Sequence, residues 1–513
     1  MLATTCRRLR FLALLLLCQC DVAVRAQEPA LALEETIVKL IERIEPSVVS
    51  IARVKPAPQE AAFPERPFPE RRRPERIFPP DNPEDPDFQP NEFGTGIIIA
   101  PPGGDERLVL TNYHVVRGGP VFPSTSTDNR TSLNIRFGSR RSCDASIIAA
   151  DPRSDLAVLR LHFKNGDPPP ADLKPLDWSS ATPVRKGQFV LMLGNPHALA
   201  RDGSASVSWG MISNLARRPL PWTKEGPSKL LYRLGNLLQI DGRLNLGTSG
   251  GPVVNLKGEL IGLTTSLAAV DGYEKSAGFA IPLDDLTRRI VKSLVAGQEV
   301  EYGMLGIEPA DVTPTEFREL GIAANQGSAA KVYGLVRDSP ADRAGIEQGD
   351  VLLRIAGEPA YSEHDLMRLV GLHAPEQEIE LLVWRRNHVE PFPVKVKLGK
   401  WPVADDEGII ETNPRFAPWR GLSVDYPTGR AKYSAGERPT PPYRRAVVVI
   451  RVAEETPAHA AGLQPGTFIS HVNKTPVQTP SEFHAAIKSA TGPVTLRLYP
   501  DRLGEGRTII VRE

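Results

Sequence analysis

A serine inside a run of glycines near the middle of the chain is the residue whose setting best suits chemistry. Ser249 lies between Gly247 and the pair Gly250 and Gly251, and Pro252 follows directly. Because glycine has no Cβ, the hydroxyl stays poorly covered and a ligand can approach the backbone closely. Such a loop suits a serine nucleophile, since its own N–H groups can stabilise a developing oxyanion. The same residues also fit a glycine-rich turn between two strands, so the choice depends on the upstream sequence.

Two upstream segments supply the partners that a serine nucleophile requires. His114 closes an apolar, strand-like run that starts at Leu110, and Asp155 opens another such run. In a Ser/His/Asp constellation the imidazole accepts the hydroxyl proton, while the carboxylate fixes the tautomer and stabilises the imidazolium. The order His, Asp, Ser on a strand-rich background is that of the chymotrypsin class. Taken singly, His114 would also fit a core histidine, and Asp155 a turn residue at the start of a strand.

Other carboxylates and histidines compete for these roles. Asp151 stands close to Asp155, but its neighbour Pro152 favours a role in a turn. His162 and His197 lack so compact a motif.

The stretch from Gly247 to Gly251 also matches G-x-S-x-G, the pattern of α/β-hydrolases. That fold needs a helix immediately after the serine and a histidine last in chain order. The sequence Pro252-Val253-Val254 disfavours such a helix, and the later histidines His364 and His459 lie in a repeated part of the chain. The α/β-hydrolase interpretation is therefore disfavoured.

The first 26 residues resemble a secretory signal. Arg7, Arg8 and Arg10 precede the apolar run Phe11–Leu17, and a cleavage site is expected after Ala26. The apolar run is too short to span a bilayer as a mature helix. We therefore expect a periplasmic or secreted protein; an uncleaved anchor, which would keep the chain near a membrane, is the alternative.

Length, charge and cysteine content set further bounds. The chain has 513 residues, which suggests roughly three domains at about 150 residues each. A formal net charge of +1 gives no overall attraction to nucleic acid or anionic membranes. Three of the four cysteines fall in the signal-like segment, and Cys143 is the fourth. The mature fold is therefore expected to have no intrachain disulfide.

The chain up to about residue 300 predicts mainly strands. An amphipathic helix is expected over 31–44, a strand over 47–51, and a closing helix over 283–296. Residues 55–92 are rich in Pro, Glu and Arg, and form an expected loop with too little apolar content to pack. Short strand-like runs then follow one another, separated by Gly and Pro: 94–100, 108–111, 132–137, 145–148, 157–161, 189–194, 206–212 and 259–264. This pattern indicates a mainly β fold, a barrel or a sandwich.

Past residue 300 the chain repeats itself. Pro340 and Gly345 recur as Pro457 and Gly462, each pair 117 residues apart. A repeat of that length is two whole domains rather than two units of a solenoid.

Several motifs together resemble the HtrA (DegP/DegS-type) family of trypsin-like serine proteases. They occur in the family's order: Gly94–Gly96, Thr111–Val116, Asp151–Leu159, Leu193–Pro196, Trp209–Ser213, Asn245–Pro252 and Gly278–Pro282. The resemblance covers most of residues 31–513. It implies a chymotrypsin-like double β-barrel over 27–298, followed by PDZ domains over 299–400 and 408–513. The family usually assembles as trimers, so a homotrimer or a higher oligomer is expected.

The resemblance also assigns the site. It implies Ser249 as nucleophile, His114 as general base, Asp155 as its orienter, and the N–H groups of Gly247 and Ser249 as the oxyanion hole. The residue before the serine is usually Asn in this family and here is Thr248. Its side chain is not needed for attack, so activity is expected to survive the change. The family's Pro one position further upstream is Leu246, which alters the expected rigidity of the loop.

In the first repeat the resemblance implies a loop whose N–H groups hold a peptide carboxylate. Its residues are Met304, Leu305, Gly306 and Ile307. The peptide would add a strand there, against a helix near 363–371. In the second repeat 419–422 takes the loop position and Thr467 replaces the Asp seen at Asp350. We expect the second repeat to keep the fold, and we doubt that it binds peptides.

The predicted function is a serine endopeptidase that degrades unfolded or damaged envelope proteins through an acyl-enzyme. Expected partners are unfolded proteins and C-terminal peptides. No cofactor is needed, and because no Cys/His cluster has metal-ligand spacing, no metal is expected. The alternative is a catalytically idle chaperone or peptide-binding scaffold on the same fold, which the intact Ser249, His114 and Asp155 disfavour.

Overall fold

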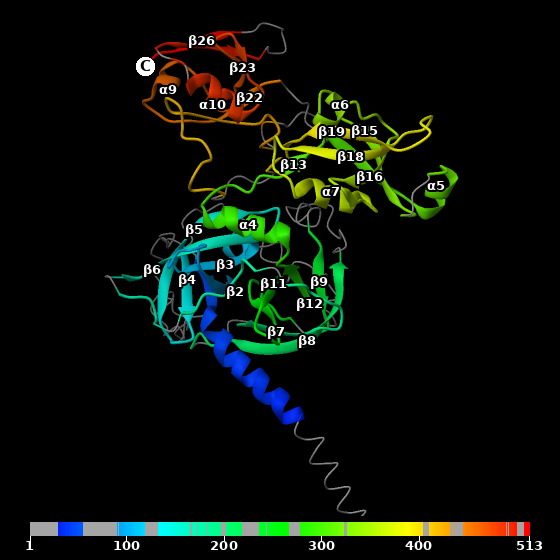
Figure 1. Ribbon diagram of the computed structural model, residues 1–513. Helices are drawn as coiled ribbons and strands as arrows, with labels where there is room; N and C mark the ends of the chain where they lie inside the picture. The colour runs from blue at the N-terminus through cyan, green and yellow to red at the C-terminus, as the bar shows by residue number, and fades with distance from the viewer. Residues whose placement is uncertain are drawn as a thin grey trace, which may run out of the picture.

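The computed structural model describes the chain from residue 29 to residue 513 with gaps (Figure 1). The gaps are 55–89, 91, 118–131, 165–166, 172, 181, 196–201, 218–234, 243, 266–277, 323–325, 404–409, 431–432, 434–444, 489, 491 and 500–506. The expected signal segment and nearly all of the Pro-rich loop lie outside the described residues.

Six strands close the first barrel in the order β1-β2-β3-β6-β5-β4. Strand β1 pairs with both β2 and β4, which completes the ring. Strand β2 begins at Glu92, earlier than the sequence predicts, where Arg53 of β1 forms an ion pair of 2.5 Å with the Glu92 carboxylate. The strands are β1 (Val48–Val54), β2 (Glu92–Ile99), β3 (Leu108–Asn112), β4 (Ser132–Phe137), β5 (Ser142–Asp151) and β6 (Leu156–His162).

A second barrel of six strands follows, in the order β10-β11-β12-β9-β8-β7. Strands β10 and β11 are buried along their whole length, as their continuous apolar sequence favours. The strands are β7 (Phe189–Gly194), β8 (Ser206–Arg217), β9 (Leu237–Ile240), β10 (Pro252–Asn255), β11 (Leu260–Thr264) and β12 (Gly278–Pro282).

One buried apolar cluster runs through the seam between the barrels. It contains Leu110 of the first barrel, Leu193 and Val254 of the second, and Ile290 and Leu294 of helix α4 (Asp285–Val295). Asp284 begins α4 because its carboxylate accepts a hydrogen bond from the amide of Thr287 at 2.9 Å. Burying each of these large side chains stabilises the fold by about 1.5–3 kcal/mol. The packing at the seam therefore holds residues at its edge in place.

A helix over residues 29–44 precedes the first barrel and projects from it (Figure 1). Only its final turns are buried, at Leu40 and Ile44. Leu33, which the helical spacing places on the apolar face, is 39% exposed. Arg43 fastens the end of the helix to the second barrel by donating to the carbonyl of Lys257 at 2.5 Å.

The two repeats each form a small β domain above the barrels in Figure 1. In the first, strands β14 (Ile307–Val312), β15 (Ala329–Leu335), β16 (Val351–Ile355), β18 (Glu378–Trp384) and β19 (Phe392–Lys397) form the sheet in that order, and β17 (Glu358–Pro359) pairs with β16. The helices are α5 (Pro314–Glu319), α6 (Pro340–Arg343) and α7 (Glu363–Gly371). A separate pair, β13 (Gly303–Met304) and β20 (Gly399–Lys400), closes the base of the domain.

The second repeat has the same layout. Its sheet runs β21 (Leu422–Asp425), β22 (Val447–Val452), β23 (Phe468–Val472), β25 (Val494–Leu498) and β26 (Thr508–Val511), with β24 (Thr475–Pro476) paired to β23. Its helices are α9 (Pro457–Ala460) and α10 (Pro480–Lys488).

The repeated prolines have a shared structural cause. Ser339 and Thr456 cap α6 and α9 through their side-chain oxygens, and Pro340 and Pro457 take the first helical position. Proline suits that position because its missing N–H would have had no helical partner. The prediction of a mainly β fold, a double barrel followed by two further β domains, is confirmed.

Candidate active site

A histidine and an aspartate meet at the edge of the first barrel. The Nδ1 atom of His114 lies 2.9 Å from Oδ1 and 2.8 Å from Oδ2 of Asp155. The backbone N–H of His114 also donates to Oδ1 at 2.9 Å. The Asp155 carboxylate is fully buried and the His114 side chain is 13% exposed. The carboxylate therefore fixes which ring nitrogen faces it and leaves Nε2 on the other edge of the ring.

Neighbouring backbone groups set the position of both side chains. Strand β3 ends at Asn112, and His114 lies in the short helix α2 (Tyr113–Arg117) that follows, rather than in the strand itself. The carbonyl of Asp155 accepts from the amide of Tyr113 at 2.9 Å and from Nδ2 of Asn112 at 3.0 Å. The two segments thus hold each other by main-chain as well as side-chain bonds.

Ser249 lies in the tight loop that leads into β10. Gly247 and Gly250 on either side of it have φ of +97° and +85°, a region that side chains with a Cβ rarely adopt. A Cβ on Gly250 would lie 2.1 Å from the carbonyl oxygen of Thr95 and 2.5 Å from Oγ1 of Thr111. The glycines therefore allow this loop of the second barrel to press against strands β2 and β3 of the first.

The peptide that carries the Ser249 amide is fixed through its carbonyl. The Thr248 carbonyl accepts from the amide of Gly251 at 3.0 Å and from Oγ1 of Thr264 at 2.5 Å. In a trans peptide the C=O and N–H groups point in opposite directions. The Ser249 amide is thus directed away from Gly251 and Thr264. The Gly247 carbonyl is likewise held, by Oγ1 of Thr95 at 2.7 Å.

Strand β11 connects the two halves of the site. Thr264 accepts from the amide of Gly250 through its carbonyl, at 2.9 Å. The next residue, Thr265, makes a longer contact of 3.4 Å from Oγ1 to Oδ2 of Asp155. Two adjacent residues thus contact the serine loop and the aspartate, so the structure brings Ser249 to the same seam as His114 and Asp155.

Threonines that were assigned no role in the sequence contribute to this geometry. Thr95 holds the Gly247 carbonyl, accepts from the amide of Asn195 at 3.1 Å, and donates its own amide to the Ser249 carbonyl at 2.9 Å. The motif Gly94–Gly96 marks this position, but nothing in the sequence shows that its hydroxyl reaches a loop over 150 residues away.

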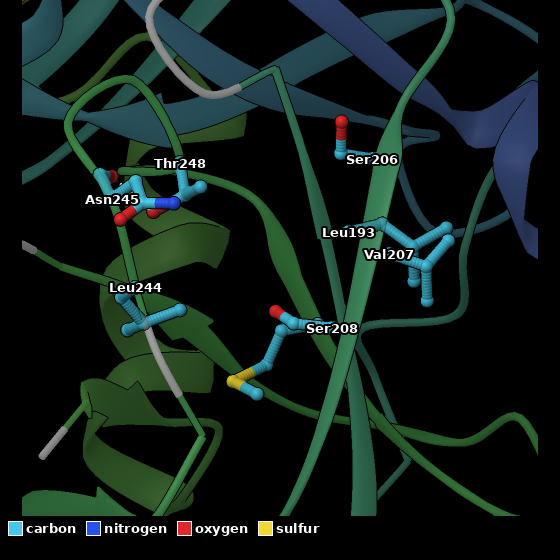
Figure 2. Close-up of a pocket in the computed structure, with 8 residues that line it drawn as sticks. Leu193, Ser206, Val207, Ser208, Leu244, Asn245 and Thr248 are labelled. Atoms are coloured by element: carbon cyan, nitrogen blue, oxygen red, sulfur yellow. Dashed lines mark hydrogen bonds between the residues drawn. The ribbon is translucent and has the colours of Figure 1, made fainter. Parts of the chain in front are cut away.

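A pocket of about 160 Å³ lies beside the serine loop. Figure 2 shows Leu244, Asn245 and Thr248 along one wall, facing Leu193 and the strand segment that carries Val207. The Thr248 hydroxyl donates to the Asn245 carbonyl at 2.7 Å. The Thr248 side chain thus serves the loop itself, and the survival of activity with Thr in place of the family's Asn stays a prediction.

The other residues weighed in the sequence have different roles. Asp151 ends β5 and accepts from the amide of Ser154 at 3.1 Å, which is the turn role that its neighbour favours. His162 lies on the barrel surface, 2.7 Å from Oγ of Ser146. Cys143 is a free, buried thiol whose pKa is raised to about 12 by burial, so it is protonated at neutral pH and is a poor nucleophile. Within the described ranges, no three His, Cys, Asp or Glu residues are placed to hold a metal.

The candidate peptide loop of the first repeat is a tight turn between β13 and β14. Leu305 is buried at the centre of its domain and Gly306 has φ of +79°. The carbonyls of Leu305 and Gly306 accept from the amides of Ala341 and Val336, both at 3.0 Å. Across the described part of the chain, no main-chain hydrogen bond uses the amides of Leu305 and Gly306.

Comparisons with known proteins agree with this architecture. A trypsin-like peptidase domain model matches residues 94–263, and a PDZ domain model matches 331–385 and 448–499. A probable periplasmic serine endoprotease, DegP-like, from Brucella suis is 31% identical over 405 residues, which are 77% of this chain and 68% of that protein. The periplasmic pH-dependent serine endoprotease DegQ of Escherichia coli is 27% identical over 479 residues, 93% of this chain and 90% of that protein.

A solved structure is also similar. The HtrA-type protease AlgW with tripeptide is 25% identical with a TM-score of 0.51, over 72% of this chain and 98% of that chain. The fold and the matched domains define the class: this is a trypsin-like serine endopeptidase with two PDZ domains. The similarity across most of each relative goes further, and the chain belongs to the HtrA family of DegP-like serine endoproteases. In the part of the chain that the structure describes, no helix combines the length and apolarity needed to cross a membrane.

Proposed function

We propose that Ser249 is the nucleophile, His114 the general base and Asp155 the group that orients the imidazole. Oγ of Ser249 attacks the scissile carbonyl carbon while Nε2 of His114 takes its proton. The amides of Gly247 and Ser249 stabilise the oxyanion. His114 then protonates the leaving amine, which leaves an acyl-enzyme. Water, deprotonated by the same imidazole, releases the second product and restores the serine.

The observation that carries this assignment is the paired contact of His114 Nδ1 with the buried Asp155 carboxylate, at 2.8 and 2.9 Å. A neutral imidazole held in this way has its other nitrogen available as a base. The serine loop also supports the assignment, because its glycines and its bonds to Thr95 and Thr264 hold it between the two barrels.

Cleavage of casein by three variants tests the triad. Ser249→Ala should lower the rate by about 10³-fold or more, since residues of a triad act as a unit. Ser47→Ala is the matched control, because it removes another serine hydroxyl that is 1% exposed and lies outside the site. Equal cleavage by Ser249→Ala and wild type would remove the assignment and favour the idle scaffold.

We infer that the substrates are unfolded or damaged proteins. A peptide bond has to reach Ser249 on a chain that is free to enter the seam, and folded proteins keep their backbone in hydrogen-bonded elements. Casein should therefore be cleaved and a folded, stable protein of the same size spared. Equal cleavage of both would contradict this inference.

We propose a periplasmic or secreted location with residues 1–26 removed as a signal. The signal-like sequence and the periplasmic names of the relatives support it. We also propose that the protease domain spans residues 27–298 and that the two PDZ domains span 299–400 and 408–513. The mass of the protein purified from its native host tests the cleavage: a chain that starts at Met1 would contradict it.

We propose that the chain works as a homotrimer or a higher oligomer. The helix over 29–44 leaves Leu31, Leu33 and Val38 between 39% and 54% exposed on an element that projects from the barrel. Such apolar surface suits a neighbouring subunit. Light scattering of the full chain should give a multiple of three subunits, and a monomer at micromolar concentration would contradict the proposal.

We propose that the first PDZ domain binds peptide C-termini through Met304, Leu305, Gly306 and Ile307. The amides of Leu305 and Gly306, which no main-chain hydrogen bond uses within the described residues, support it, as does the solved AlgW structure with a tripeptide. A peptide with a free carboxylate should bind the Ser249→Ala chain, and its amidated form should bind at least about tenfold more weakly. Unchanged binding on amidation would exclude this mode.

A further inference from the structure

The turn that carries Asp155 is held together by a second carboxylate. Asp155 itself has φ of +58°, a conformation that a residue with a Cβ keeps only when its surroundings enforce it. The Asp151 carboxylate accepts from the amide of Ser154 at 3.1 Å and from Nε of Arg153 at 2.9 Å. The turn between β5 and β6 is therefore organised around Asp151, four residues before the catalytic candidate.

The partners of this turn lie outside the barrels. The hydroxyl of Tyr302 donates to Oδ2 of Asp151 at 2.5 Å. The guanidinium of Arg153 donates to the carbonyl of Val300 at 2.5 Å and to that of Trp401 at 3.1 Å. Val300 and Tyr302 belong to the segment that joins the second barrel to the first PDZ domain, and Trp401 follows the last strand of that domain.

Burial makes these contacts depend on one another. Asp151 and Arg153 are each 1% exposed and Tyr302 is 0% exposed. The Arg153 guanidinium also lies over the Tyr302 ring, 4.6 Å from its centroid. Burial raises the pKa of Tyr302 well above its usual value, and Asp151 adds to this, so the phenol remains a donor. A buried charge that loses one partner is strongly destabilised, so loss of one contact disturbs the whole turn.

We propose that Tyr302, together with Asp151 and Arg153, is a positioning residue for the protease reaction. The three residues hold the Asp155 turn in its left-handed conformation, and through it they set the carboxylate that faces His114. The joint between the barrels and the first PDZ domain is thereby part of what aligns the catalytic base. This inference rests on the proposed role of Asp155.

The substitution Tyr302→Phe tests it in the full chain. It removes only the hydroxyl and leaves the ring in place over Arg153. We expect kcat for a short peptide substrate to fall roughly tenfold, because a small misplacement of a catalytic group is costly, while KM stays within about twofold. The variant Arg153→Lys keeps the charge but cannot reach Asp151 and both carbonyls at once, so the same selective loss in kcat is expected.

A second buried tyrosine provides the matched control. The hydroxyl of Tyr426 donates to the Glu376 carboxylate, in a contact between the PDZ domains rather than with Asp151. Tyr426→Phe removes the same atom from the same kind of partner. It should lower the thermal midpoint about as much as Tyr302→Phe and leave kcat unchanged. Equal loss of kcat in both variants would show a merely structural role and overturn the inference.

Parallel measurement of Ser249→Ala separates this inference from the proposed function. If Ser249→Ala is inactive and Tyr302→Phe retains wild-type kcat, the positioning role is wrong and the triad stands. If Ser249→Ala keeps its activity, the triad assignment itself is wrong.

Discussion

In the first PDZ domain the loop before β14 passes through Leu305 and Gly306, and in the second the loop before β21 passes through Arg420 and Gly421. The carbonyls match: Leu305 and Arg420 accept from the amides of Ala341 and Ala458, at corresponding places in the two folds. Within the described residues, no main-chain hydrogen bond uses the amides of Leu305 and Gly306 or those of their counterparts Arg420 and Gly421, so the two loops differ one residue further on. The Leu422 amide is bonded to the Trp419 carbonyl at 2.8 Å, which closes the second loop on itself.

The side chains reinforce this difference. Arg420 has φ of +49°, and its guanidinium donates to the carbonyls of Val511 and Gly492, both at 2.8 Å. Trp419 packs edge-on against Phe483 of α10, with ring centroids 6.1 Å apart. The second loop is thus held by a main-chain bond across its own turn and by its side chains. Two copies of one fold can therefore keep the same main-chain frame and differ in what their loops can bind.

The two domains are also attached differently. The contacts of the first with the protease include neutral acceptors, for example the Gly371 carbonyl, which accepts from Arg289 at 2.8 Å. The second is attached through a buried cluster of charges. Lys400 lies 3.0 Å from Asp425 of the second domain and 3.0 Å from Glu299 at the start of the first PDZ domain. Arg430 contacts Glu299 at 2.8 Å. The second attachment should therefore depend more strongly on pH.

The largest expected effect concerns the position at which Asp350 and Thr467 differ. The Asp350 carboxylate is buried and accepts from Nε and Nη2 of Arg385 at 2.7 and 2.8 Å. Asp350→Thr should destabilise the first PDZ domain by about 2–4 kcal/mol, because Arg385 and the neighbouring amide lose the carboxylate that accepts their hydrogen bonds. Thr467→Asp should change the stability of the second PDZ domain by less than about 0.5 kcal/mol. Hydrogen exchange resolved by domain measures both, and equal effects would contradict the comparison.

Acid should loosen the second domain before the first. Burial alone would raise the pKa of Glu299, but Lys400, Arg430 and Arg153 hold it at about 2, below its ordinary value of 4.5. A carboxylate whose pKa is lowered by folding contributes stability that is full above the ordinary value and is lost as the pH falls from 4.5 towards 2. In that range, hydrogen-exchange protection near Asp425 should fall earlier than protection in β16.

Lys400→Met sharpens this test, since it removes the cation that contributes most to lowering the pKa of Glu299. The loss of protection should then begin at a higher pH. Lys395→Met is the matched control, because its side chain is 69% exposed and its ammonium makes a longer contact of 3.6 Å with Glu378. An identical pH profile for the two variants would show that the buried cluster does not hold the second domain.

Peptide binding should depend on the loop amides of the first PDZ domain. Titration of the Ser249→Ala chain with a peptide that has a free carboxylate should give one site per chain. Gly306→Val should weaken this binding by more than about tenfold, because a β-branched residue strongly disfavours the φ of +79° found there. Two sites per chain, or binding that survives Gly306→Val, would break the comparison.

The smallest expected effect is at Arg420. Arg420→Leu gives the second loop the side chain found at Leu305 and removes two hydrogen bonds, at a cost of about 1–2 kcal/mol. No second peptide site should appear, because the Leu422 amide remains bonded to Trp419. Calorimetric titration that shows a second site in this variant would mean that the arginine alone blocks the loop.

Local chemistry in the sequence was enough to predict much of the structure of this protein. Alternating and continuous apolar runs predicted most strands of both barrels, though not β9 and β12, since burial of one or both faces requires that spacing. Glycines around Ser249 indicated a tight loop, because positive φ and close backbone contact both need a residue without a Cβ. The repeated Pro340 and Pro457 marked two copies of one domain, each opening a capped helix.

Contacts between distant segments were decided by tertiary structure alone. Nothing near Thr95 indicates that its hydroxyl holds the Gly247 carbonyl, and nothing near Tyr302 indicates that it bonds Asp151. Asp151 itself read as a turn residue, and only the fold shows that the turn is anchored outside the barrels. The physical reason is that hydrogen bonding and burial depend on three-dimensional distance, which sequence spacing does not encode for residues brought together by the closing of a barrel or the docking of a domain.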